Sequence, residues 1–317
     1  MNRGPPTTEY RELRRADLPS FEKVMLQGLG KLERATGLDE LSITQFQSLR
    51  RRGVWTLLAF LRATGRAPIR FFVGVDRGQV LGTASVILLA KVGYVVGVAT
   101  DSSSRSLGIA THLLERIHLE AKRKGKPWLA LDVETDNETA IRVYKRLGFE
   151  ERAQFGWYAG PTPGTDVSPS SAMTEASRSD TEEVVDWINR SLPPAVRDPL
   201  PATRRRLSHF EIVTRVPRAP SKTWRLSSSD QITAVVRCSY IQTIKTGYVL
   251  PITYDPSLTE ESLLSIAKPA IGWIRSLGAT RTVVVVSDPQ GAWGSALASI
   301  GLPRAVSTTL MARQVAK

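Results

Sequence analysis

A segment in the first half of the chain has the composition of an anion-binding loop. It reads Arg105-Ser106-Leu107-Gly108-Ile109-Ala110-Thr111 and lies between a valine-rich, strand-like stretch and a stretch with helical spacing. A loop that runs into a helix N-terminus presents unpaired backbone N–H groups and the positive end of the helix dipole. Such an end suits a phosphate or pyrophosphate group. We therefore expect an anion site here, with Gly108 allowing close backbone approach. An ordinary strand-to-helix connection is the alternative.

A second pattern lies downstream and strengthens this interpretation. An aliphatic strand over 128–134 leads to Asn137, with an alanine three residues later, a tyrosine seven later, and Gly148-Phe149 eleven and twelve later. The two patterns together resemble the GNAT superfamily of N-acyltransferases over about residues 70–158. One departure is Ser102, where the family commonly has proline. The resemblance implies a mixed sheet that is splayed open between its fourth and fifth strands, with the pantetheine of acyl-CoA lying in the splay.

The resemblance also implies which residues bind acetyl-CoA, the acyl donor. The backbone amides of Arg105 to Thr111 would hold the pyrophosphate. The edge of the preceding strand, at Val98, Ala99 and Thr100, would pair with the pantetheine, and an amide there would polarise the thioester carbonyl. Asn137 matches a residue that contacts the cofactor.

Three side chains are candidates for the proton transfers. Tyr144 matches the tyrosine that protonates the departing thiolate, although its spacing from Ala140 and Leu147 also suits a core residue. Asp132 and Glu134 point to one face of their strand, where either is a candidate base for the amine. Asp132 matches the glutamate base of relatives that acetylate protein N-termini. Those relatives have E-V-R where this chain has D-V-E, which puts that substrate class in doubt. A water relay and solvated edge-strand charges are the alternatives.

These residues must be positioned by regular elements, which hydrophobic periodicity predicts. The first half is expected to contain a short strand, two helices, three strands, a helix, a strand, a helix and a strand. Their ranges are 10–14, 18–32, 43–63, 70–75, 80–90, 92–100, 107–122, 128–134, 138–147 and 153–158.

The second half repeats this order. Its expected elements are 181–191, 223–226, 232–241, 247–250, 260–277, 282–286 and 291–299. The segment 247–250 echoes 93–96, and 300–302 echoes 147–149, at offsets of 154 and 153 residues. Anchors whose offsets agree within one residue indicate a duplication, with chance similarity of β-α-β patterns as the alternative. The predicted fold class is α/β with mixed sheets, in two tandem GNAT folds: a domain over 1–160, a linker over 161–175 and a GNAT-like domain over 176–317.

The second copy has lost the chemical pattern. The residues at its loop, asparagine and tyrosine positions are Thr259, Ser262, Leu264, Gln290 and Leu297. We therefore expect this half to lack acetyl-CoA chemistry. It would instead supply part of the acceptor cleft, or replace the homodimer contact of single-domain relatives.

Composition limits the other possibilities. The chain has 317 residues, 42% of them hydrophobic, and a formal charge of +13. Cys238, the only cysteine, is expected in the core, and the three histidines have no metal-ligand spacing, so no metal is expected. No stretch suits a membrane span or a secretory signal, which favours a cytoplasmic protein. The basic charge suits nucleic acid or a ribosome, but no motif accompanies it. The arginine runs 50–52 and 204–206 are interpreted as solvated.

The sequence thus predicts an N-acetyltransferase, a monomer or dimer, that transfers the acetyl group of acetyl-CoA to a primary amine. The amine would be a protein N-terminus, a lysine or a small molecule, and it would attack directly in a ternary complex. A non-catalytic acyl-CoA-binding regulator or scaffold is the alternative.

Overall fold

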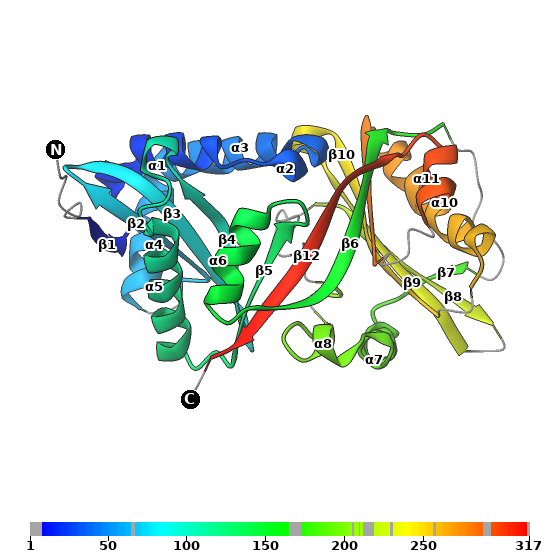
Figure 1. Ribbon diagram of the computed structural model, residues 1–317. Helices are drawn as coiled ribbons and strands as arrows, with labels where there is room; N and C mark the ends of the chain where they lie inside the picture. The colour runs from blue at the N-terminus through cyan, green and yellow to red at the C-terminus, as the bar shows by residue number, and fades with distance from the viewer. Residues whose placement is uncertain are drawn as a thin grey trace.

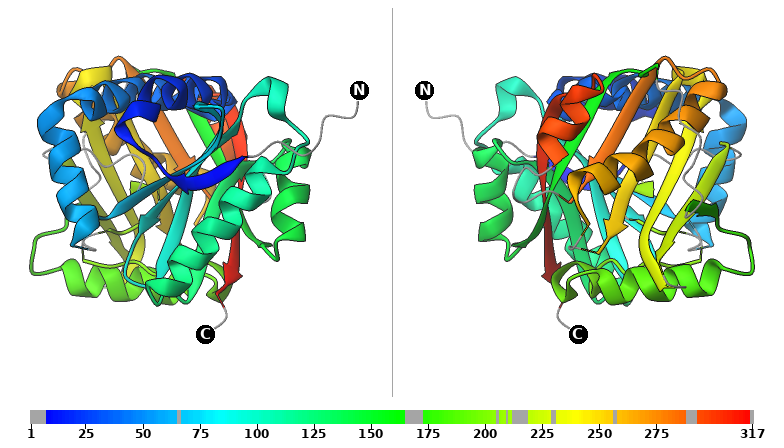
Figure 2. Two further views of the ribbon diagram at one scale, coloured as in Figure 1. Left: turned by 90° about the vertical axis from the view of Figure 1, so that its left-hand side faces the viewer. Right: turned by 90° about the vertical axis from the view of Figure 1, so that its right-hand side faces the viewer.

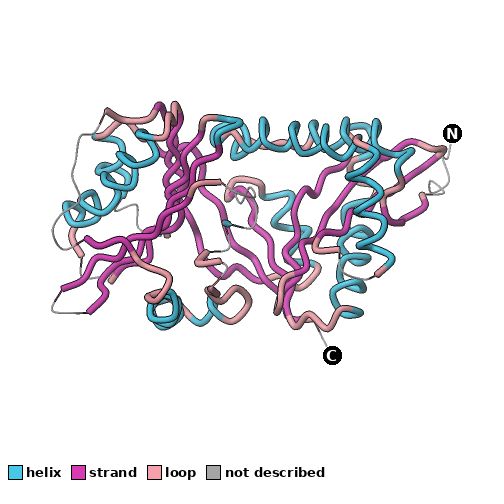
Figure 3. Tube along the Cα trace, turned by 180° about the vertical axis from the view of Figure 1, so that it is seen from behind, coloured by secondary structure: helices cyan, strands magenta, loops and turns pink. Residues whose placement is uncertain are grey.

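The structure is a computed structural model that describes residues 8–64, 67–164, 173–204, 206–208, 210–211, 219–228, 231–255, 258–287 and 293–315. Its strands form one mixed sheet that passes through both halves (Figure 1). The strand order is β1-β2-β3-β4-β5-β12-β6-β11-β10-β9-β8-β7. Helices cover both faces of this sheet (Figures 2 and 3).

The first half follows the predicted order of elements, with two differences. Its elements are β1 Glu9–Glu12, α1 Leu18–Gln27, α2 Lys31–Thr36, α3 Leu38–Arg50, α4 Arg52–Ala63, β2 Ile69–Asp76, β3 Gln79–Leu88, β4 Val92–Thr100, α5 Ile109–Arg123, β5 Trp128–Glu134, α6 Glu138–Arg146 and β6 Glu150–Pro161. The helix predicted over 18–32 breaks at a turn containing Gly28 and Gly30. The helix predicted over 43–63 breaks at Arg51, whose backbone is extended.

The second half repeats the plan and adds two strands and a short helix that the sequence patterns did not predict, over 173–175, 304–314 and 194–197. Its elements are β7 Met173–Glu175, α7 Thr181–Ser191, α8 Pro194–Arg197, β8 Ser221–Ser228, β9 Gln231–Ile241, β10 Thr246–Tyr254, α10 Glu260–Ser276, β11 Arg281–Val286, α11 Trp293–Ser299 and β12 Arg304–Gln314. The turns after α6 and α11 are alike. Phe149 N–H donates to Tyr144 O at 3.0 Å, and Leu302 N–H donates to Leu297 O at 2.9 Å. The chain is therefore a structural duplication in which Leu297 occupies the place of Tyr144.

The two halves exchange their last strands. β12, from the end of the chain, lies between β5 and β6, while β6 of the first half pairs with β11 of the second. Phe155 of β6 pairs with Thr308 of β12, and these two residues are 153 positions apart, so they are equivalents. Trp157 Nε1–H also donates to Thr308 Oγ1 at 2.9 Å. The two halves are therefore related by a local two-fold axis that passes between these two strands. The sheet is continuous from the first half to the second.

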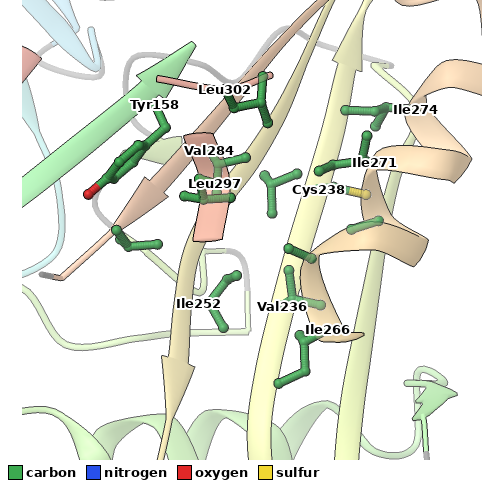
Figure 4. Packing of buried hydrophobic residues seen from close by; sticks show 14 of the residues in the cluster. Tyr158, Val236, Cys238, Ile252, Ile266, Ile271, Ile274, Val284, Leu297 and Leu302 are labelled. Atoms are coloured by element: carbon green, nitrogen blue, oxygen red, sulfur yellow. The ribbon is translucent and has the colours of Figure 1, made fainter. Parts of the chain in front are cut away.

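Separate apolar clusters cover the two faces of the sheet. In the first half, α5 and α6 pack on one face, and α1 packs on the other. In the second half, α10 and α11 cover a cluster that includes Cys238, which is fully buried as predicted (Figure 4). No helix in the described ranges has both the length and the apolar character needed to cross a bilayer. The cytoplasmic location stays a prediction.

Candidate active site

The sheet opens between β4 and β5. These parallel strands pair only at Val92–Trp128, Gly93–Leu129 and Tyr94–Ala130 and then diverge. Beyond this point β4 keeps its partner β3 but bulges near Gly97, whose φ is +61°. β5 is instead paired along its whole length with β12. We call this opening the fork. The predicted pantetheine edge, Val98 to Thr100, lies on the β4 arm of the fork.

The predicted anion loop leads directly into α5. Gly108 is the N-cap of α5 with a φ of +76°, so the cap has no side chain to occupy the first N–H groups of the helix. The first backbone hydrogen bond of the helix runs from His112 N–H to Gly108 O at 3.1 Å. Among the backbone hydrogen bonds of the described chain, none is donated by residues 108–111. Ser102–Ser104 forms a 3-10 turn that Asp101 caps. The N–H groups at the start of α5 therefore have no backbone partner, as an anion site requires.

Tyr144 lies on the α5/α6 side of the fork. It packs in one cluster with Val95 of β4 and Val133 of β5, and its ring meets Phe149 edge-on at 5.9 Å. Burial raises the pKa of Tyr144 to about 12. None of the hydrogen bonds between described residues involves its hydroxyl. Asn137 is the exposed N-cap of α6, and its Oδ1 accepts the Ala140 N–H at 3.1 Å.

Asp132 lies on the opposite face of the sheet. Leu129, Leu131 and Val133 of β5 pack toward α5 and α6, so Asp132 points the other way, as the strand alternation predicts. Its Oδ2 accepts a hydrogen bond from the hydroxyl of Tyr94. Tyr94 belongs to the last position at which β4 and β5 pair. Asp132 is therefore the first residue on this face of β5 after the two strands separate.

Glu134, also on this face, anchors a helix. Its Oε1 accepts the Leu32 N–H at the start of α2 at 2.8 Å, while Glu33 Oε2 accepts the Gly30 N–H at 2.7 Å. Gly30 lies so close to Glu134 that a Cβ there would collide with the carboxylate, and Gly28 is equally close to Ala99 of β4. The α1–α2 turn therefore crosses the open part of the fork, from the β4 arm to the β5 arm. Sequence reasoning missed this crossing, for which the two glycines are the signal.

Comparison with known proteins identifies this arrangement. The family model described as the Acetyltransferase (GNAT) family matches residues 36–149. An IAA acetyltransferase from Azospirillum brasilense is 33% identical over 105 residues, which are 32% of this chain and 68% of that protein. The chain belongs to the GNAT acetyltransferase family. A mycothiol acetyltransferase from Mycolicibacterium gilvum is 43% identical over 127 residues, which are 37% of this chain and 42% of that protein.

Solved structures extend the GNAT fold to the whole chain. A GCN5-related N-acetyltransferase from Sphaerobacter thermophilus has a TM-score of 0.62 at 13% identity and covers 99% of this chain and 98% of that chain. A tandem GNAT protein from the clavulanic acid biosynthesis pathway has a TM-score of 0.55 at 10% identity, covering 98% of this chain and 99% of that chain. The predicted fold of two tandem GNAT units is therefore confirmed.

The fork of the second GNAT half is filled by the protein's own side chains. Trp293 stands where the first half has Ala140, and it is fully buried. It packs in one cluster with Ile252 of β10 and Val286 of β11, beyond the last paired position of those strands. The start of α10 is also occupied, because Thr259 Oγ1 accepts the Ser262 N–H at 3.3 Å. Gln290, aligned with Asn137, lies outside the described residues.

The second half also covers the Asp132 face of the first GNAT half. Phe210 is buried and meets both Phe155 and Trp157 edge-on at 4.9 Å. Arg206 was expected to be solvated but is partly buried, and its Nη2 donates to Pro201 O at 3.1 Å. Burial and the nearby Asp132 carboxylate raise the pKa of Tyr94, and the charge of Arg206 opposes this shift. The side of the fork that bears Asp132 is thus built from both halves.

Proposed function

We propose that the first GNAT half transfers the acetyl group of acetyl-CoA to a primary amine. The observation that carries this proposal is the pairing of an open fork with the start of α5 at Gly108, where the backbone N–H groups are left for a ligand. A pyrophosphate fits such a helix start, and a pantetheine amide fits the β4 edge that β5 has left. In the second half, Trp293 fills the space between β10 and β11, and Thr259 caps the start of α10. These two differences support a single donor site in the chain.

In this proposal, residues Arg105 to Thr111 hold the pyrophosphate through their N–H groups. Val98, Ala99 and Thr100 present the strand edge to the pantetheine, and Asn137 lies beside the donor at the start of α6. The amine nitrogen attacks the thioester carbon, the C–S bond breaks, and the acetyl group passes directly to nitrogen with no covalent enzyme intermediate.

Two side chains on opposite faces of the fork handle the protons. Tyr144 donates its hydroxyl proton to the departing CoA sulfur. The raised pKa of Tyr144 keeps its hydroxyl protonated until that step. A thiolate in the same buried environment is also more basic, because burial disfavours its charge. Asp132 accepts the proton that the ammonium form of the amine must lose before attack. Glu134 anchors the backbone of α2 through the Leu32 N–H, whereas Asp132 lies where the sheet opens and its partner is a side-chain hydroxyl, so we assign the base to Asp132 in preference to Glu134.

The test is turnover of acetyl-CoA by the purified full-length chain with a panel of peptides, lysine derivatives and small amines. Tyr144→Phe should bind CoA with an affinity within about twofold of wild type and should lower kcat by ~10²–10⁴. Tyr240→Phe is a matched control, because Tyr240 is equally buried but lies in the second half. Its kcat should not change.

Two results would contradict the proposal. One is CoA binding by calorimetry with no acetyl transfer to any amine, which would instead favour a non-catalytic acyl-CoA-binding protein. The other is full activity of Tyr144→Phe, which would remove the tyrosine from the mechanism.

A further inference from the structure

Tyr94 occupies a place at the fork that the GNAT sequence pattern does not include. It pairs with Ala130 in the last position before β4 and β5 separate, and it is only 2% exposed. Its ring packs in the cluster on the Asp132 face, which also contains Leu38 and Leu41 of α3. The phenol is therefore held firmly, and its hydroxyl ends at Oδ2 of Asp132.

We infer that Tyr94 is the positioning residue that holds Asp132 ready to accept the proton of the amine. This inference rests on the proposed function. A free aspartate on a strand can rotate about two side-chain bonds, whereas one oxygen tied to a fixed hydroxyl leaves the carboxylate few orientations. The hydroxyl meets Asp132 at the point where the sheet opens, so the carboxylate is held beside the fork.

The direction of the hydrogen bond suits a base. A phenol O–H donates and a carboxylate oxygen accepts, so the contact ties Oδ2 of Asp132 to a fixed donor and leaves the carboxylate an acceptor. Burial, followed by the charge of Asp132, raises the pKa of Tyr94 well above its ordinary value, so the phenol stays protonated at neutral pH. During turnover the proton of the ammonium group moves to Asp132 and then to water. Tyr94 keeps its own proton throughout. Tyr144 supplies the separate proton that CoA takes, and the second proton that the nitrogen loses as the amide forms replaces it through water.

The second half provides an internal comparison. Tyr248 stands at the same position of β10, paired with Val283 as Tyr94 is paired with Ala130. The residue equivalent to Asp132 is Val285, which cannot accept a hydrogen bond through its side chain. The hydroxyl of Tyr248 instead donates to the backbone oxygen of Thr36 at 2.8 Å and ties the second half to α2. The buried tyrosine is thus present in both halves, but it meets a carboxylate only in the half that keeps the anion loop.

A double-mutant cycle on the full-length chain tests the inference. Acetyl-CoA turnover is measured for wild type, Tyr94→Phe, Asp132→Asn and the double variant, with the best amine of the panel. We expect Tyr94→Phe to lower kcat by about tenfold, because it removes one hydrogen bond to a charged group, with the KM for acetyl-CoA within about twofold. Asp132→Asn should lower kcat by about 10² or more. The double variant should equal Asp132→Asn, because the hydroxyl acts only through the carboxylate.

Tyr248→Phe is the matched control for loss of a buried tyrosine hydroxyl. It should lower the urea midpoint of unfolding and leave kcat unchanged. Calorimetric binding of CoA checks that each variant is folded. Asp132→Glu gives a second test that leaves Tyr94 in place. The longer side chain displaces the carboxylate from the hydroxyl, so kcat should fall although a base of similar strength remains.

Each outcome bears on the inference. If Asp132→Asn is impaired but Tyr94→Phe or Asp132→Glu is fully active, the inference is wrong and the proposed function stands. If the losses of the two single variants multiply in the double variant, Tyr94 acts by another route and the inference is also wrong. If the wild-type chain acetylates no amine, the proposed function itself fails, and Asp132 has no proton to accept.

Discussion

Replacing Gly108 by alanine tests whether the loop before α5 is shaped for a bound anion. Gly108 has a φ of +76°, in the left-handed region that side chains with a Cβ disfavour. A Cβ at this position would meet no atom closer than His112 Cδ2 at 4.0 Å, so the methyl group fits sterically. The cost is therefore the backbone conformation alone, about 1–2 kcal/mol.

Gly125, at the other end of α5, offers a matched control. Its φ is +61°, and a Cβ there would have no heavy atom within 4 Å. Gly125→Ala should therefore lower the free energy of unfolding by a similar amount, about 1–2 kcal/mol, measured by urea denaturation. The two variants carry the same kind of strain, but only Gly108 lies among the N–H groups assigned to the pyrophosphate.

The two variants should differ in CoA binding, measured by calorimetry. Alanine at 108 relieves its strain by rotating the backbone, which turns the neighbouring N–H groups away from a common point. We expect the Kd for CoA to rise by about tenfold, equivalent to about 1.4 kcal/mol, while Gly125→Ala binds as wild type. Equal affinities for the two variants, with equal losses of stability, would refute the assignment of residues 105–111 to the pyrophosphate.

Two further predictions concern stability. Thr308→Val leaves the buried Nε1–H of Trp157 without its acceptor. It should therefore lower the free energy of unfolding by about 1–3 kcal/mol in urea titrations. An unchanged midpoint would mean that this hydrogen bond does not help to join the halves. Burial, with a further contribution from the charge of Glu134, raises the pKa of Glu33, although the Gly30 N–H opposes the shift. The protonated form is then favoured by folding, so Glu33 contributes stability below its unfolded pKa of about 4.5 and loses that contribution as pH rises through the higher folded value. Glu33→Gln should therefore be more stable than wild type at pH 7, with the difference shrinking toward pH 4, and a difference independent of pH would contradict this.

Local sequence patterns determined most of the elements around the site. The bounds of β4, β5 and α7 agree with the prediction, because apolar alternation and helical spacing are read from neighbouring residues. Gly108 and Gly148 were singled out from the two local patterns in which they occur, and both have positive φ. The duplication was also visible, since both copies retain the turn after their last helix.

The tertiary structure alone decided which segments meet at the fork. β12 was not predicted, and its place between β5 and β6 depends on pairing between residues 146 to 186 positions apart. The chemical roles of the acidic residues also depend on partners from other parts of the sequence. On one strand, Glu134 receives the N–H of Leu32 and Asp132 receives the hydroxyl of Tyr94, although alternation makes the two carboxylates equivalent. Periodicity specifies the face to which a side chain points, whereas only the folded chain brings a donor to that face.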